Sequence, residues 1–169
     1  MPSLTRSGKE IAAEFGAAST SFIAAVEAFP EDRWHETCPD EGWSYAVTAH
    51  HVASGFEVAS GFVQAVAAGE VLPELTWDDV NAQNAAHAMR MARVTKSEVL
   101  AALRELRALA IAAVSPLTRE QLGRRGNPIP LFGGQSLMAT EIADMLLVKH
   151  PAMHTTGMNA VAFRSRLQP

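Results

Sequence analysis

Apolar positions in the first thirty residues recur at the spacing of an α-helix. Intervals of four, three, four, four and three residues separate them, which places all six side chains on one helical face. They are Ile11, Phe15, Ala18, Phe22, Val26 and Phe29. Pro30 follows at once and ends this helix, because proline lacks the N–H that would continue the hydrogen-bond pattern. Further along, alanine is abundant and β-branched alternation is nearly absent, which favours helices throughout.

Capping residues predict two more long helices in the middle of the chain. One begins near Ser44 and runs to Ala68, where Gly69 closes it. Another begins at Thr95, because Glu98 three residues later completes a capping box, and it ends around residues 115–116. Between these two, residues 76–94 are also expected to be helical, but they are polar in their first half.

The last third of the chain predicts a loop and a fourth long helix. Residues 123–134, "GRRGNPIPLFGG", hold four glycines and two prolines and therefore predict a loop that could border a pocket. Ser136 is a candidate cap for a final helix from Leu137 toward Phe163. Because each long helix has one apolar face to bury, we expect an all-α protein, an antiparallel four-helix bundle. An extra short helical segment lies between the second and third long helices, and residues 1–169 form a single domain without repeats or linkers.

Composition narrows the class of protein. Apolar residues make up 48% of the chain and the net charge is −4, so no basic surface favours nucleic acid or an anionic membrane. No apolar run is long enough to span a membrane, and residues 1–10 lack the apolar stretch of a signal peptide. The single cysteine, Cys38, cannot form an internal disulfide, which favours the cytoplasm. The apolar content also predicts a homodimer through an exposed helix face.

Helical geometry sorts the histidines by the direction in which they point. In the second helix His51 lies on the apolar face, whereas His50 lies among polar residues and is expected in solvent. His150 and His154 both project to the apolar side of the last helix, one turn apart. The second-helix face is defined by Val47, Val58, Phe62 and Val66. The last-helix face is defined by Ala139, Ala143, Leu146, Leu147, Met153 and Val161.

Three inward histidines on two helices indicate a metal site. A lone inward histidine is more often a hydrogen-bonded core residue, but buried neighbouring imidazoles need a shared partner. Three neutral imidazoles leave a position open on a divalent ion, which is typical of a catalytic site. His35 and His87 are expected on the surface, although the segment that carries His87 could pass over the pocket mouth. Cys38 has no basic neighbour in sequence and is not expected to be a nucleophile.

Other metal and nucleotide sites are not indicated. The chain has no Glu-x-x-His pair of the di-iron type and no glycine-rich nucleotide motif. Pro151 follows His150 directly and deprives the carbonyl of Leu147 of its helical partner. We therefore expect a kink at this point rather than the end of the helix. A helix that ended before His150 would contradict the ligand assignment.

The run "GWSYAVTAHHVASGFE", residues 42–57, resembles the second-helix signature of the DinB-like superfamily, with a histidine seven residues after the serine. The spacing of His150 and His154 resembles the family's second signature, and residues 77–106 resemble its middle portion. The superfamily includes the N-terminal domain of mycothiol-dependent maleylpyruvate isomerase. This resemblance implies a helical bundle and a divalent metal ion, commonly zinc or nickel. The ligands would be His51, His150 and His154, with His51 preferred to His50 because of its spacing from Trp43 and Ser44.

The resemblance also implies a class of reaction. Relatives are thiol-dependent transferases and isomerases that use mycothiol, bacillithiol or glutathione. These 169 residues are expected to correspond to that N-terminal domain alone, without the second domain of the maleylpyruvate isomerase, which counts against that particular reaction. Our first hypothesis is therefore a metal-dependent enzyme of the thiol-transferase or isomerase type, acting on a small-molecule thiol and an electrophilic substrate. The catalytic acid and base stay unassigned.

Three alternatives remain open from the sequence. A metal-dependent hydrolase would use water in place of the thiol. A binding protein would keep the metal or small-ligand site without chemistry. In a purely structural bundle the histidines would be satisfied core residues.

Overall fold

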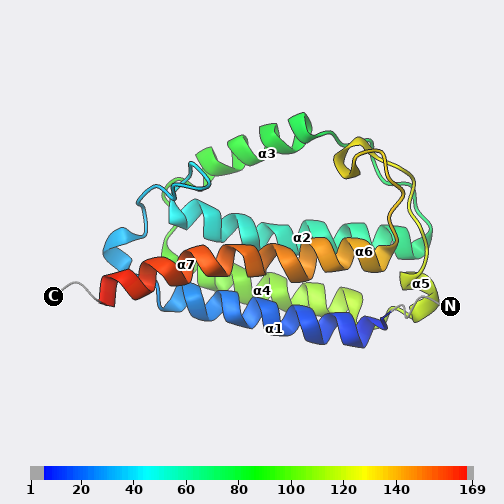
Figure 1. The fold of residues 1–169 in the computed structure, drawn as a ribbon, viewed down its shortest axis with the longest axis horizontal. Coiled ribbons are helices and arrows are strands. Elements are labelled where there is room, and N and C mark those ends of the chain that lie inside the picture. The colour runs from blue at the N-terminus through cyan, green and yellow to red at the C-terminus, as the bar shows by residue number, and fades with distance from the viewer. Residues whose placement is uncertain (1–5, 167–169) are drawn as a thin grey trace.

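The computed structural model describes residues 6–166, with side chains described as far as residue 161. Its long helices are α1 (Gly8–Glu27), α2 (Tyr45–Ala68) and α4 (Lys96–Val114). The last helical stretch is divided into α6 (Ala139–Ala143), η3 (Asp144–Lys149) and α7 (His150–Arg166). Shorter elements are η1 (Glu31–Arg33), α3 (Trp77–Arg90), α5 (Arg119–Leu122) and η2 (Pro130–Phe132). Residues 6–166 form no β-strand, so the all-α, four-helix architecture is confirmed (Figure 1).

Caps fix the ends of the long helices where the sequence predicts them. The hydroxyl of Ser44 accepts a hydrogen bond from the Val47 N–H at 3.2 Å and starts α2. Gly69 ends α2 with a φ of 79°, a left-handed conformation that glycine adopts without a steric cost. Thr95 and Glu98 form the expected capping box at the start of α4. The short helix α5 was not predicted, although its "TREQ" capping box is visible in the sequence.

The long helices form a ring in which α1 and α2 occupy diagonal corners. Helix α1 contacts α4 and α7, whereas α2 contacts α4 and the stretch from α6 to α7. The colours of Figure 1 show that α2 and α4 run in the same direction, as do α1 and α7. Our expectation of an antiparallel bundle is therefore wrong for these two pairs. The reason is α3, which carries the chain back along the bundle before α4 begins.

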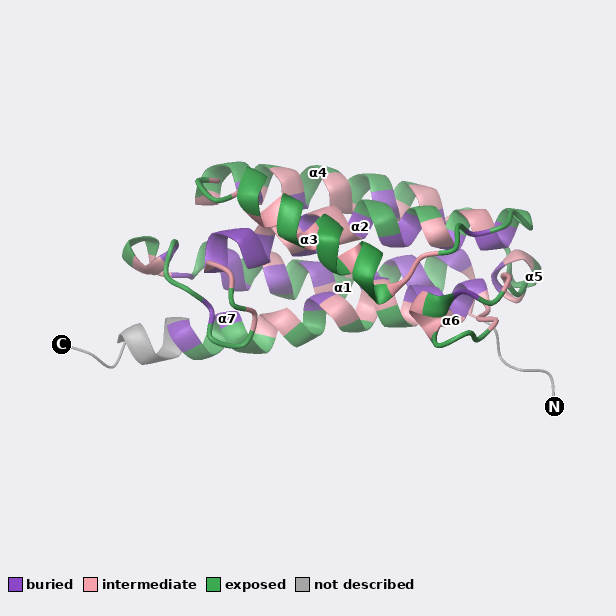
Figure 2. Ribbon diagram, turned by 90° about the horizontal axis from the view of Figure 1, so that it is seen from above, coloured by how far each residue is buried: buried purple, intermediate pink, exposed green. Residues whose placement is uncertain are grey.

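The core lies between the long helices and is rich in aromatic side chains. Phe15 of α1 and Phe56 of α2 meet edge to face across the diagonal, with ring centroids 4.9 Å apart. Trp34 closes the end of the bundle between α1 and α2, and its indole Nε1 donates to the Val94 carbonyl at 3.1 Å. Figure 2 shows buried residues along the inner faces of the long helices. None of the helices within residues 6–166 is both long and apolar enough to cross a membrane.

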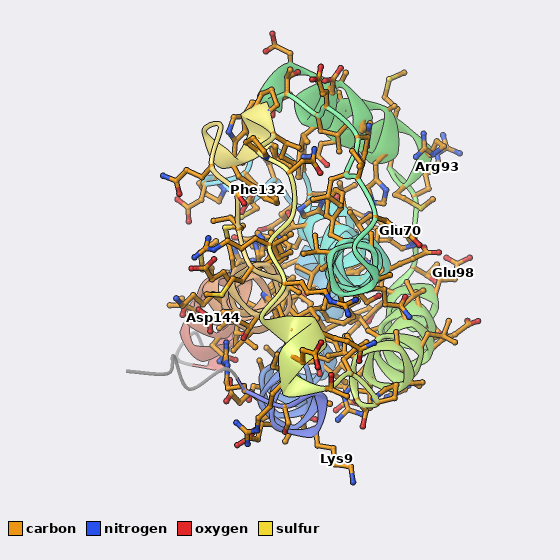
Figure 3. The ribbon with its side chains drawn as sticks, turned by 90° about the vertical axis from the view of Figure 1, so that its right-hand side faces the viewer. Lys9, Glu70, Arg93, Glu98, Phe132 and Asp144 are labelled. Atoms are coloured by element: carbon orange, nitrogen blue, oxygen red, sulfur yellow. The ribbon has the colours of Figure 1, made fainter. Side chains whose placement is uncertain are left out.

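Helix α3 lies outside this core. None of its residues is buried, and two views show it on the side of α2 that faces away from α1 (Figures 1 and 3). The loop of residues 123–134 runs beside the start of α3, because the Leu131 N–H donates to the Leu75 carbonyl at 2.8 Å. Helix α3 and this loop therefore lie next to the outer face of α2, which the other long helices leave uncovered.

The final helix differs from the prediction at its start and in its middle. Ser136 is not its cap, because its hydroxyl donates to the Gly126 carbonyl at 2.6 Å and closes the preceding loop. Instead α6 begins after Met138, whose N–H donates to the Glu141 carboxylate at 2.7 Å. The segment η3 is π-helical, and the His150 N–H donates to the Met145 carbonyl, one residue further back than in an α-helix.

Candidate metal centre

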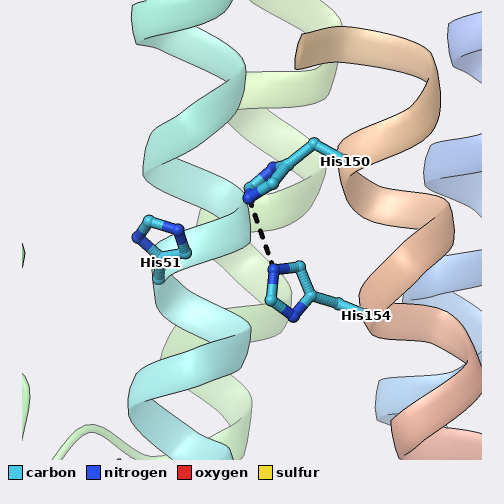
Figure 4. Close-up of side chains that lie close together, drawn as sticks. All are labelled: His51, His150 and His154. Atoms are coloured by element: carbon cyan, nitrogen blue, oxygen red, sulfur yellow. Dashed lines mark hydrogen bonds between the residues drawn. The ribbon is translucent and has the colours of Figure 1, made fainter. Parts of the chain in front are cut away.

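Three of the six histidines converge between α2 and α7. His51, His150 and His154 each offer a ring nitrogen, and these three atoms lie within 4.8 Å of one another. His51 comes from the first half of α2, and the other two come from the first turns of α7 (Figure 4). The structure therefore brings together the three residues that the sequence predicts, while their binding of a metal stays a prediction.

The two histidines of α7 face each other as the helical spacing predicts. Their Nε2 atoms are 3.3 Å apart, and the ring centroids are 4.9 Å apart at a steep angle. The helix does not end before His150, so the condition that would have contradicted the ligand assignment is not met. The proline is accommodated by the π-helical η3 directly before it, and π-helical turns are frequent at functional sites. The expected kink itself stays a prediction.

Neighbouring residues hold the imidazoles in place. The ring of Trp43, just before α2, packs against His51 with centroids 5.5 Å apart. Gly55, one turn after His51, makes room for His150, because a Cβ at this glycine would lie 3.4 Å from the His150 Cε1 atom. The "WS" pair of the sequence thus has two local roles, since Trp43 supports His51 and Ser44 caps the helix that carries it.

Burial keeps the three imidazoles neutral. Loss of solvent, together with the nearby His154 and His87, lowers the pKa of His51 to about 4. The pKa of His150 falls to about 3 for the same reasons. The pKa of His154 is lowered by burial, although the carboxylate of Glu41 opposes this shift. At pH 7 each ring therefore carries one nitrogen with a free lone pair, which is the form that binds metal ions.

Glu41 is a site residue that the sequence analysis did not find. Its Oε1 lies 3.2 Å from Nδ1 of His154. Burial lowers the pKa of His154, so the contact joins a neutral imidazole to a carboxylate rather than two full charges. A carboxylate at this distance favours the tautomer with its proton on Nδ1, which leaves the lone pair on Nε2, the atom nearest His150. Metal-binding histidines commonly hold a carboxylate in this way.

Two expectations about the other histidines are wrong. His50 and His87 are half-buried rather than solvent-exposed, and Nδ1 of His50 lies 3.2 Å from Nε2 of His87. The error arose because α3 covers this part of α2, which no pattern in α2 itself reveals. His35 is exposed, as expected. Cys38 is buried in the core.

The apolar faces also differ in detail from those assigned by regular helical geometry. Val58 is 56% exposed because it lies on a face of α2 that no long helix covers. Met153, which we assigned to the apolar face of the last helix, is 67% exposed, whereas Pro151 is buried. The π-helical turns of η3 hold more residues than α-helical turns, so a count of 100° per residue across them misplaces the face that follows.

Comparison with known proteins identifies the family of this chain. The sequence profile of the DinB superfamily matches residues 14–156. No curated protein sequence matches the chain significantly. Among solved structures, the mycothiol-dependent maleylpyruvate isomerase is similar with a TM-score of 0.72 and 13% identity. That match covers 90% of this chain but only 61% of the isomerase chain.

Two further structures are similar over nearly their whole length. YfiT from Bacillus subtilis, described as a probable metal-dependent hydrolase with an unusual four-helix bundle topology, has a TM-score of 0.71 and 17% identity, over 98% of this chain and 93% of its own. The sibling lethal factor precursor DfsB has a TM-score of 0.72 and 12% identity, over 95% and 97% of the two chains. At these identities the structures show a shared fold. Together with the profile match over most of the sequence, they establish that this chain belongs to the DinB superfamily.

Proposed function

We propose that this protein is a metal-dependent enzyme of the thiol-transferase or isomerase type. His51, His150 and His154 would hold a divalent ion, with zinc and nickel as the first candidates. The observation that carries this proposal is the convergence of three neutral imidazoles from α2 and α7 within 4.8 Å of one another. Imidazole nitrogen suits both metals, and burial keeps the three lone pairs free of protons at pH 7.

The donor set leaves room for chemistry. When bound by three imidazoles, a divalent ion keeps a coordination position open, where it lowers the pKa of a thiol or a water molecule. The residues of this chain prepare that site. Glu41 lies 3.2 Å from Nδ1 of His154, where its charge favours a proton on that nitrogen, and Trp43 packs against the ring of His51. Helix α3 passes over the outer face of α2 and brings the ring of His87 to 6.3 Å from that of His51, measured between centroids.

The thiol is the finer part of the proposal. It is supported by the structural similarity to an isomerase that depends on mycothiol. Mycothiol, bacillithiol and glutathione are the candidate co-substrates, with an electrophilic small molecule as the acceptor. A metal-dependent hydrolase is the second candidate, because YfiT, which carries that description, matches this chain over almost its full length. A protein that binds the metal without catalysis is the remaining alternative. The homodimer and the cytoplasmic location stay predictions.

Two measurements test this proposal in sequence. The first is the metal content of protein purified without a histidine tag, compared with the His51→Ala variant. We expect close to one triad-bound ion per chain in the wild type and its loss in the variant; protein that binds no ion on addition of zinc or nickel would refute the site. The second incubates each thiol with electrophilic acceptors, with and without chelator. Thiol consumption that chelator and His51→Ala both abolish supports a transferase, whereas none above background in any combination refutes it.

A further inference from the structure

The strongest feature outside the three-histidine site is the contact between His50 and His87. The two side chains come from different helices, α2 and α3, and are separated by 37 positions in sequence. Nδ1 of His50 and Nε2 of His87 lie 3.2 Å apart, and the ring centroids are 5.0 Å apart. We propose that His50 and His87 form a second site for a divalent transition-metal ion, distinct from the three-histidine site, which fastens α3 to α2.

The separation of the two nitrogens fits two ligands of one ion. Zinc–nitrogen bonds are about 2.0–2.1 Å long, so two imidazole nitrogens on one ion are about 2.9–3.4 Å apart for octahedral or tetrahedral geometry. The His50–His87 distance of 3.2 Å lies in this range. It also matches the 3.3 Å between His150 and His154, the pair that we assign to the first site.

Both imidazoles are half-buried, and each presents a ring nitrogen to the other. The affinity for an ion would come from these two nitrogens.

Little apolar packing holds helix α3 to the bundle. It buries none of its residues, so the apolar packing that holds the long helices together contributes little to its position. His87 is the side chain through which α3 bonds to the bundle, and a single hydrogen bond between neutral groups contributes only about 1 kcal/mol. Two metal–nitrogen bonds would hold the helix more firmly. Water and the hydroxyl of Ser54, 3.4 Å from Nδ1 of His50, are available to complete the coordination.

The proposed site is close to the first site but does not share its residues. The ring centroid of His87 lies 6.3 Å from that of His51. His50 and His51 are neighbours in sequence, but His51 turns toward α7 and His50 turns toward α3. An ion between His50 and His87 would therefore position α3 beside the three-histidine site without occupying it.

Metal titration of the untagged full chain tests the proposal. Zinc and nickel are added to the metal-free wild type and to His87→Ala, His50→Ala and His150→Ala, with bound metal measured after equilibrium dialysis. His35→Ala is the matched control, because His35 is exposed in a turn. We expect two tightly bound ions in the wild type and the control, and one tightly bound ion in each of the other variants. The second ion should bind at least about tenfold more weakly in His87→Ala, since that variant removes one of two protein ligands.

Hydrogen exchange of α3 provides a second readout. The second equivalent of metal should slow exchange of residues 77–90 in the wild type and leave it unchanged in His87→Ala. Saturation at one ion in the wild type would refute the second site and leave the first intact. The proposal would also fail if His87→Ala and His50→Ala retained two ions. It would fail as well if either substitution weakened binding at the three-histidine site, whose ion is the one lost in His150→Ala.

Discussion

Replacement of Glu41 by glutamine tests whether this carboxylate prepares the three-histidine site. Glutamine keeps the size of the side chain and a carbonyl oxygen beside Nδ1 of His154. It removes the negative charge, which favours a proton on Nδ1 and makes the imidazole a better ligand. The variant should therefore bind metal more weakly without unfolding.

The structure sets the expected size of this effect. Loss of a residue that orients a metal ligand commonly costs 10–100-fold in metal affinity. The 3.2 Å contact is longer than the 2.7–2.9 Å that is typical of charge-assisted bonds, and the Glu41 side chain is 30% exposed. Both features favour the lower end, about tenfold in the dissociation constant, or about 1.4 kcal/mol.

Competition with a chromogenic chelator measures this change on untagged protein. Asp40→Asn is the matched control, because it removes the same charge from an exposed neighbour in the same turn. Denaturant unfolding of the metal-free proteins checks that both variants fold. If Glu41→Gln bound zinc as tightly as Asp40→Asn, the assigned role of Glu41 would be wrong.

Three further predictions concern stability and the environment of the site. Metal-free protein should lose stability as the pH falls from 6.5 toward 4, because the pKa values of His51 and His150 are depressed in the folded state and the unfolded chain binds more protons. Replacing either histidine by leucine should flatten the dependence of the unfolding free energy on pH, measured by urea titration. Gly55→Ala should leave metal affinity within a few-fold of wild type, whereas Gly55→Leu should displace His150 and reduce the affinity at least tenfold. Gly61→Leu is the control, because a Cβ at Gly61 meets open space. Phe56→Ala should cost about 3–5 kcal/mol in the free energy of unfolding, and a loss below 1 kcal/mol would contradict its central place in the core.

Local signals explain which parts of this structure could be predicted. The starts of α2 and α4 and the end of α2 depend on residues only three or four positions apart, and all three were predicted correctly. The inward direction of His51 and the facing pair on α7 follow from helical spacing alone. Helical spacing cannot show that the histidines of two different helices lie close together. The resemblance to the family supplied the expectation that His51 meets His150 and His154.

The features that could not be predicted depend on contacts between distant segments. Glu41 meets His154 across more than a hundred positions, and its loop has no periodic pattern from which to infer a direction. His50 looks like a surface residue because only the return of α3 along the bundle covers it. The π-helical η3 was not foreseen, because the expectation at Pro151 considered only local hydrogen bonds, whereas α6, η3 and α7 all pack against α2.

The direction of the helices explains why the site forms near the start of α2. Because α7 begins halfway along the bundle and runs antiparallel to α2, its first turns lie beside the first half of α2. The connection from α1 reaches the same end and contributes Glu41 and Trp43. Helix α3 then returns to this end and brings His87 to His50. Had α3 been a short turn, α4 would have run antiparallel to α2, and the second histidine pair could not have formed. The crossover through α3 is therefore also the element that brings His87 to His50, beside the three-histidine site.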